Sequence, residues 1–174
     1  MIEKYVPDVY TKSIYYINYD KLYKKGVRCL LFDLDNTITP PHVNKPTKRL
    51  KKLFGELKDK GFKIIIISNS PRYRIEPFKR ELAVDACAFS IKPRKNKYEK
   101  IMEKFKYNPS ELASIGDQLL TDIQGANKLD ITSVLVNPLT EHDYSITFFN
   151  RVLEKFIYSR LETKDLLVRG KYYE

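Results

Sequence analysis

The 174-residue sequence contains only two cysteines, Cys29 and Cys87, and neither has a Cys or His neighbour at a metal-binding spacing. Both lie in apolar segments, so we expect buried thiols in a reducing compartment. No run approaches the about 18 consecutive apolar residues of a membrane span, and residues 1–7 lack the layout of a signal peptide. These absences argue against a disulfide-rich secreted protein and an integral membrane protein, and we expect a cytoplasmic location.

Acidic residues are the minority among the charged ones, with 22 Asp and Glu against 32 Lys and Arg and a formal net charge of +10. Such an excess favours an anionic partner, which could be a phosphorylated substrate, a nucleic acid or an acidic membrane surface. The charge alone does not choose among the three. The length is sufficient for one domain with a core of its own.

From residue 27 onward, short β-rich runs alternate with segments of helical period, which is typical of an α/β protein with a mainly parallel sheet. The pattern predicts five strands, at 27–32, 63–67, 86–91, 112–115 and 133–136. We expect a Rossmann-like three-layer sandwich over residues 26–145. An aromatic segment, residues 1–25, would pack on this core, and an amphipathic helix and tail would follow over residues 146–174.

Two aspartates, Asp33 and Asp35, directly follow the first apolar strand. The carboxyl ends of strands are where open α/β sheets bind ligands. Two neighbouring carboxylates make each other costly to ionise unless a cation or a shared proton intervenes. Taken alone, however, Asp35 and the following Asn36 and Thr37 could equally form a turn with local hydrogen bonds.

Polar residues suited to phosphate chemistry also follow the next three predicted strands. These are Ser68 and Asn69 after the second strand, Lys92 after the third, and Asp117 and Asp122 after the fourth. Any one of them could be a helix cap, a surface lysine or a turn residue. In a parallel sheet, however, all these ends lie at one edge, so we expect the residues to converge on one crevice.

The ordered set Asp33-x-Asp35-x-Thr37, Ser68, Lys92 and Gly116-Asp117-x-x-x-x-Asp122 resembles the four motifs of the haloacid dehalogenase-like (HAD) phosphatases, subclass IIIA. The resemblance spans roughly residues 27 to 137. The runs 33–37, 68–70 and 116–122 are similar to those of the bacterial YqeG-type branch, which is related to the phosphatases of phosphatidylglycerophosphate. Ser70 departs from that branch, where a second Asn is expected, and this leaves contacts beyond the phosphate open.

The resemblance implies a magnesium-dependent phosphatase and a role for each motif residue. Asp33 would attack phosphorus to form an aspartyl-phosphate, and Asp35 would act as general acid and base. Ser68, Asn69 and Lys92 would hold the phosphate. Mg²⁺ would be bound by Asp33, Asp117 and the main-chain carbonyl of Asp35, with Asp122 supporting these ligands or orienting Lys92.

The spacing of the motifs leaves no room for an inserted cap domain, either in residues 37–68 or in residues 68–92. The open site would admit a phosphate carried on a lipid headgroup, a protein or a nucleic acid end. The resemblance implies the lipid phosphatidylglycerophosphate, at the inner face of a membrane. A soluble phosphomonoester or a phosphoprotein is the first alternative, and a non-catalytic RNA- or membrane-binding module is the second. Nucleic acid has the least support, because the sequence contains no recognition motif or stacking platform.

Two further features bear on an anionic substrate. Basic residues near the expected pocket include Arg74, whose place after Ser68 could aim it at a second phosphate of the substrate. In the C-terminal segment, one helical face carries Phe149, Val152, Leu153, Phe156 and Ile157, with Arg151, Lys155 and Arg160 at its margins. That face could lie in a membrane interface, but we expect it to pack on the sheet. The lone histidines, His42 and His142, have no partner at a catalytic spacing.

Overall fold

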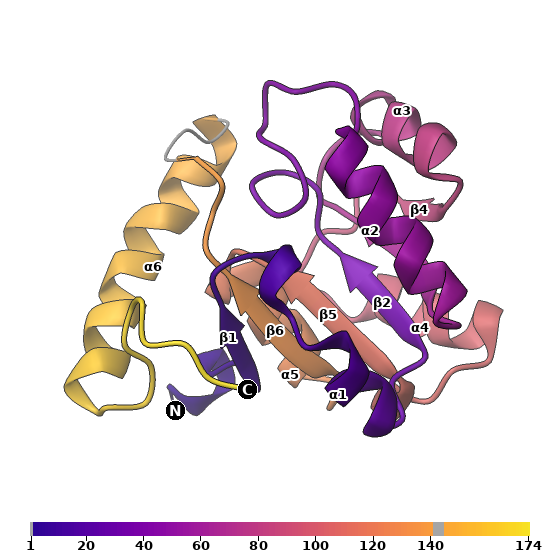
Figure 1. Ribbon diagram of the computed structural model, residues 1–174. Helices are drawn as coiled ribbons and strands as arrows, with labels where there is room; N and C mark the ends of the chain where they lie inside the picture. Colours follow the sequence, from indigo (N-terminus) through magenta and orange to yellow (C-terminus); the bar gives the residue numbers. More distant parts are fainter. Residues whose placement is uncertain (1, 141–144) are drawn as a thin grey trace.

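The computed structural model describes residues 2–140 and 145–174, and in the C-terminal helix it describes side chains from Val152 onward. A sheet of six parallel strands in the order β1-β6-β5-β2-β3-β4 forms the centre. Helices cover it on both sides (Figure 1). The strands are β1 (Val9–Thr11), β2 (Cys29–Phe32), β3 (Lys63–Ile67), β4 (Asp85–Cys87), β5 (Leu112–Gly116) and β6 (Thr132–Val136).

The α-helices are α1 (Tyr19–Lys24), α2 (Lys48–Asp59), α3 (Arg72–Leu82), α4 (Asn96–Phe105), α5 (Gln124–Asn127) and α6 (Ser145–Thr163). Short helical turns are η1 (Glu3–Tyr5), η2 (Ile14–Tyr16), η3 (Pro109–Glu111) and η4 (Leu119–Ile123). Between β2 and β3 the chain forms a loop and α2, and between β3 and β4 it forms α3. Both connections are therefore too short to hold a cap domain, as the motif spacing predicted.

The central strand β2 is buried along its whole length and divides the core into two layers. Leu30 and Phe32 face one cluster, which includes apolar residues of α1, α2 and α3. Cys29 and Leu31 face another cluster, which includes residues of α4 and α5. This alternation follows from the two-residue period of a strand, and it gives the predicted three-layer α/β arrangement.

The sheet has one strand more than the five that the sequence predicted. The additional strand, β1, belongs to the aromatic segment at the N-terminus and pairs with β6, with Tyr10 opposite Leu135. All three residues of β1 are buried, so its sequence shows no alternation between apolar and polar positions. A strand of this length without alternation carries too little periodicity to be distinguished from packed coil.

The third predicted strand, 86–91, is too long in the prediction: β4 spans Asp85–Cys87. The apolar pattern included Phe89 and Ile91 in the strand, but both residues lie in a loop, with positive φ angles of 48° and 53°. This loop is held by hydrogen bonds from Phe89 N to Ser70 O (3.1 Å) and from the Ser90 hydroxyl to Cys87 O (2.9 Å). Both apolar side chains are therefore directed into solvent and not into a strand.

The helix α6 packs on the core, as expected, but among the described side chains Ile157 is the one member of the predicted face that is buried. Ile157 and Leu161 are buried in a cluster with Tyr10 and Leu135, and Glu154 is buried beside them. Val152, Leu153 and Phe156, which were assigned to the buried face, are instead exposed. The predicted face followed the largest apolar residues, whereas the observed one includes Glu154, whose carboxylate accepts a hydrogen bond from Leu120 N at 3.2 Å. Phe149, Arg151 and His142 lie outside the described side chains.

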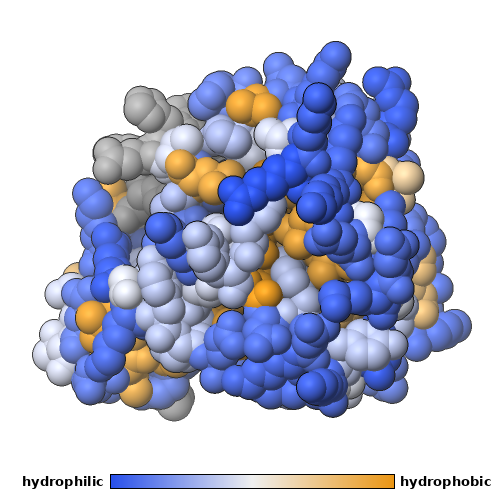
Figure 2. Space-filling model, in the orientation of Figure 1, coloured by the Kyte–Doolittle hydropathy of each residue, from blue (hydrophilic) through white to orange (hydrophobic). Residues whose placement is uncertain are grey.

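The surface is mostly hydrophilic on the face drawn in Figure 2, where hydrophobic residues are visible only in small, separated patches. Within residues 2–140 and 145–174, no helix is both long enough and apolar enough to cross a membrane.

Candidate active site

The residues that the sequence assigned to a site come from segments that follow β2, β3, β4 and β5. Because these strands are parallel, their carboxyl ends share one edge of the sheet. The register places Phe32 opposite both Ile66 and Ile115, so the segments after these three strands begin at the same level. Residues distant in the sequence are brought together in this way, as predicted.

Lys92 links two of the aspartates at this edge. Its Nζ donates hydrogen bonds to Asp33 Oδ1 and to Asp122 Oδ1, both at 2.5 Å. The side chains of Lys92 and Asp122 are 2% exposed, whereas that of Asp33 is 12% exposed. Asp33 is thus the member of this group whose carboxylate is the most exposed to solvent.

Burial determines the electrostatics of the group. Burial would lower the pKa of Lys92, but the carboxylates of Asp122 and Asp33 outweigh it and raise that pKa above its usual range. Burial is also the main reason why the pKa of Asp33 is raised; Lys92 opposes the shift, and Asp122 and Asp117 add to it. Lys92 therefore stays protonated, and Asp33 needs further positive charge to be held as a carboxylate.

A metal ion fits this requirement. Asp33, Asp117 and Asp122 each offer a carboxylate oxygen, and these oxygens lie within 4.8 Å of one another. Three carboxylates lie close together and the ammonium group of Lys92 contacts two of them, so a divalent cation would balance the remaining negative charge. Oxygen donors of this kind suit a hard ion such as Mg²⁺.

Asp122 is the least available of the three as a direct ligand. One of its oxygens accepts from Lys92 and the other accepts from Gln118 N at 3.1 Å. Its approach to β5 depends on Gly116, because a Cβ atom at that position would lie 2.2 Å from Asp122 Cγ. Glycine at the end of β5 thus explains the spacing of the fourth motif. Asp117, in turn, accepts a hydrogen bond from the Thr37 hydroxyl at 3.0 Å.

Asp35 has separate partners from this acidic group. Its Oδ1 accepts hydrogen bonds from Arg74 Nε (3.0 Å) and Arg74 Nη2 (2.8 Å), and its Oδ2 accepts one from the Ser70 hydroxyl (2.6 Å). Arg74 is only 5% exposed. The sequence suggested a second substrate phosphate as the partner of Arg74, and the structure places the guanidinium against Asp35. The third nitrogen, Nη1, is buried and has no hydrogen-bond partner among the described residues.

The segment after β3 connects the two halves of the site. Ser68 is buried, and its hydroxyl accepts from Ser70 N at 3.1 Å. The amide oxygen of Asn69 accepts from Lys92 N at 2.8 Å. Asn69 thus positions the segment that carries Lys92, and its predicted contact with the phosphate stays a prediction.

Sequence reasoning did not assign a role to Ser70, Thr37 or Gln118, each of which contacts a motif aspartate. Ser70 and Thr37 stand inside the quoted motifs, so their position could have identified them. Gln118 contacts Asp122 through its main-chain N–H and carbonyl groups, which no residue type reveals. Asn36 also supports the site, since its side-chain oxygen accepts from Thr140 N (3.1 Å) and fixes the segment after β6 against the loop after β2.

The arrangement combines a partly exposed carboxylate, a lysine that offsets negative charge, an acidic group for a cation and a second carboxylate held by an arginine. These are the parts that transfer of a phosphoryl group to a carboxylate requires. The geometry also separates two roles: Asp33 faces Lys92, and Asp35 faces Arg74 and Ser70.

Comparison with known proteins agrees with this chemistry. The model of a family described as "Mitochondrial PGP phosphatase" matches residues 2–139. The "Probable phosphatase YqeG" of Bacillus subtilis (strain 168) is 33% identical over 165 residues, which cover 94% of this chain and 96% of that protein. The chloroplastic/mitochondrial phosphatidylglycerophosphate phosphatase 1 of Arabidopsis thaliana is 27% identical over 78% of this chain and 41% of its own length.

A solved structure supports the fold. A hydrolase of the HAD superfamily, subfamily III A, from Legionella pneumophila has a TM-score of 0.53 and 16% sequence identity, over 85% of this chain and 92% of that one. This likeness supports the α/β fold described above. The chain belongs to the PGP phosphatase family and is a hydrolase of phosphate monoesters with a HAD fold.

Proposed function

We propose that this phosphatase depends on magnesium and hydrolyses phosphatidylglycerophosphate to phosphatidylglycerol through an aspartyl-phosphate on Asp33. The proposed reaction is supported above all by the two hydrogen bonds of 2.5 Å from Lys92 Nζ to Asp33 and to Asp122. They hold the ammonium group of Lys92 beside the partly exposed carboxylate of Asp33. The lipid part is supported by the name of the Arabidopsis relative and by the absence of a cap between β2 and β4.

In the first step, a carboxylate oxygen of Asp33 attacks phosphorus. The new O–P bond forms as the bond from phosphorus to the substrate oxygen breaks. Asp35, in its acid form, gives its proton to that departing oxygen, so the lipid leaves as an alcohol and not as an alkoxide. Lys92 offsets the negative charge that the phosphoryl oxygens bring to Asp33.

In the second step, water attacks the phosphorus of the aspartyl-phosphate. Asp35, now a carboxylate, takes a proton from this water, and the O–P bond to Asp33 breaks. Inorganic phosphate leaves and both aspartates return to their first state. The contacts from Arg74 and Ser70 engage both carboxylate oxygens of Asp35 and fix the orientation of its side chain.

The described residues also suit the phosphate and the cation. Ser68 and the main-chain N–H groups that follow it would hold phosphoryl oxygens. Asp33, Asp117 and the main-chain carbonyl of Asp35 would hold Mg²⁺, with Asp122 behind them. When bound, Mg²⁺ would neutralise charge on the phosphate and on the acidic group.

The test of the substrate is a comparison of kcat/KM values. Phosphatidylglycerophosphate in mixed detergent micelles is compared with a panel of soluble sugar phosphates, nucleotides and phosphopeptides, each with magnesium or with a chelator. We expect magnesium-dependent turnover that favours the lipid by about tenfold or more. A higher kcat/KM for a soluble ester would leave the proposed reaction standing and would rule out the lipid as the preferred substrate.

A further inference from the structure

Two apolar side chains next to the active site project into solvent. Phe89 and Ile91 are 58% and 57% exposed, and they lie in the loop that joins β4 to Lys92. Tyr73, in the first turn of α3, is 81% exposed, and Ser70 O, three residues before it, accepts the hydrogen bond from Phe89 N. Scattered apolar residues are common on protein surfaces, but these follow neighbouring strands at the catalytic edge.

The backbone holds this loop in a costly conformation. Phe89 and Ile91 both have positive φ angles, at 48° and 53°, which are unfavourable for bulky and β-branched residues. Hydrogen bonds from Ser90 N to Ser68 O (3.0 Å) and from Arg94 N to Ile91 O (3.0 Å) keep the loop in place. Strained backbone of this kind concentrates at functional sites. Here it turns two large apolar side chains outward beside the segment that carries Ser68.

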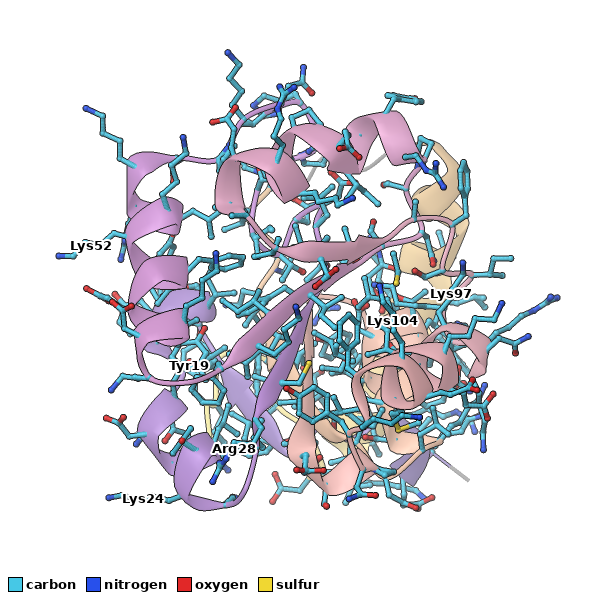
Figure 3. All side chains as sticks on the ribbon, turned by 90° about the vertical axis from the view of Figure 1, so that its right-hand side faces the viewer. Tyr19, Lys24, Arg28, Lys52, Lys97 and Lys104 are labelled. Carbon is cyan, nitrogen blue, oxygen red and sulfur yellow. The ribbon has the colours of Figure 1, made fainter. Side chains whose placement is uncertain are left out.

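Positive charge borders the apolar residues. A groove of about 560 Å³ lies between α3 and β4, and its walls include Phe89, Arg72, Lys79 and Lys97. Glu76 is the one acidic residue among the nine that line it. Arg94 and Lys95, directly after the loop, are exposed as well. Figure 3 views the molecule from this side, with Lys97 labelled.

We propose that the loop 88–91 and its basic border form a docking surface for an anionic phospholipid bilayer. Apolar side chains that enter the interface, with cations beside them that meet acidic headgroups, are the combination that binds peripheral proteins to such membranes. A protein partner on this edge would cover the catalytic opening, whereas a bilayer would present its headgroups to it. The inference rests on the proposed function, because a lipid substrate is the reason for the protein to bind a membrane. The experiment that tests it measures binding to vesicles and does not require hydrolysis of that lipid.

The chain contains no tryptophan, so a single introduced one reports on its own surroundings. We would compare Phe89→Trp with Phe156→Trp, since Phe156 on α6 is 59% exposed and thus matches Phe89. Each variant is mixed with vesicles of phosphatidylglycerol and phosphatidylcholine, or of phosphatidylcholine alone, in the presence of chelator. We expect a blue shift of the emission, and quenching by brominated lipid, only for Trp at position 89 and only with anionic vesicles.

The second measurement is vesicle sedimentation of the parent protein and of the double variant Phe89→Ser, Ile91→Ser. We expect the double variant to bind anionic vesicles about tenfold more weakly. Its turnover of p-nitrophenyl phosphate should stay close to that of the parent, which shows that the fold and the site are intact. A shift at position 156 alone, no shift at either position, or unchanged sedimentation of the double variant would overturn the proposal.

The outcomes separate this inference from the proposed function. Docking through Phe89 without hydrolysis of phosphatidylglycerophosphate would leave the surface established and remove the lipid substrate. Hydrolysis of that lipid in micelles, with vesicle binding that does not depend on Phe89, would do the reverse.

Discussion

Arg74 holds Asp35 through two hydrogen bonds to one carboxylate oxygen, from Nε at 3.0 Å and from Nη2 at 2.8 Å. Both side chains are largely buried, so the contact is shielded from solvent. Asp35 is the proposed acid and base of the reaction, and its geometry therefore depends on a residue of α3. Positioning partners of this kind commonly matter almost as much as the groups that they orient.

Substitution of Arg74 by lysine keeps the positive charge but loses the pair of hydrogen bonds to Asp35 Oδ1. We expect kcat to fall about 10- to 100-fold with little change of KM. The fall should be larger for an alkyl phosphate than for p-nitrophenyl phosphate, because the alkyl leaving group needs a proton more. Arg80→Lys, at an exposed position of the same helix, is the control. A raised KM with unchanged kcat would instead assign Arg74 to substrate binding.

Gly116→Ala should disrupt the acidic group. The added Cβ would lie 2.2 Å from Asp122 Cγ, so Asp122 must move and Lys92 loses a partner. We expect the free energy of unfolding to fall by about 1–3 kcal/mol, together with most of the activity. Gly55→Ala is the matched control, because a Cβ at Gly55 in α2 has nothing within 4 Å and should stabilise the helix by up to about 1 kcal/mol. Urea denaturation measures both, and equal stability of the two variants would contradict this account.

Magnesium should stabilise the folded protein whether or not turnover occurs. At a concentration about 100 times its Kd, a ligand adds about 2.7 kcal/mol to the free energy of unfolding, so Tm should rise by several degrees. Asp117→Asn should abolish this rise, whereas Asp130→Asn, at an exposed position, should retain it. Thermal denaturation with and without chelator gives the comparison. An undiminished rise in Asp117→Asn would place the ion elsewhere.

Two leucines of α6 test which of its faces packs on the core. Leu161 is fully buried and Leu153 is 41% exposed. We expect Leu161→Ala to lower the free energy of unfolding by about 2–5 kcal/mol and Leu153→Ala to change it by less than about 0.5 kcal/mol. Equal losses of the free energy of unfolding in chemical denaturation would instead support the buried face that the sequence predicted.

The sheet edge that carries the candidate site could be predicted because parallel strands align their ends whatever lies between them. The apolar pattern identified the strands that precede Asp33, Lys92 and Asp122. The parallel topology then brings these three side chains together. The sequence motif likewise includes Gly116. It does not show why glycine is needed at this position, which is the close approach of the Asp122 side chain.

Side-chain partners and irregular backbone could not be predicted in the same way. The Asp35 and Arg74 contact depends on the orientation of α3 relative to the loop after β2, which no local pattern specifies. Phe89 and Ile91 resemble strand residues, and only their positive φ angles reveal a loop. The burial of Glu154 in α6 likewise contradicts a rule based on hydrophobicity alone.

The central claim is that Asp33 carries the phosphoryl group, and the most direct measurement is the mass of the acid-quenched protein during turnover. In Asp35→Asn the second step lacks its base, whereas the first step still proceeds with p-nitrophenyl phosphate, whose leaving group needs a proton less. With this substrate the account predicts a species heavier by one phosphoryl group, with the modification on Asp33. The double variant Asp33→Asn, Asp35→Asn should show none. Absence of the phosphorylated species from Asp35→Asn, together with turnover that persists in Asp33→Asn, would contradict the account.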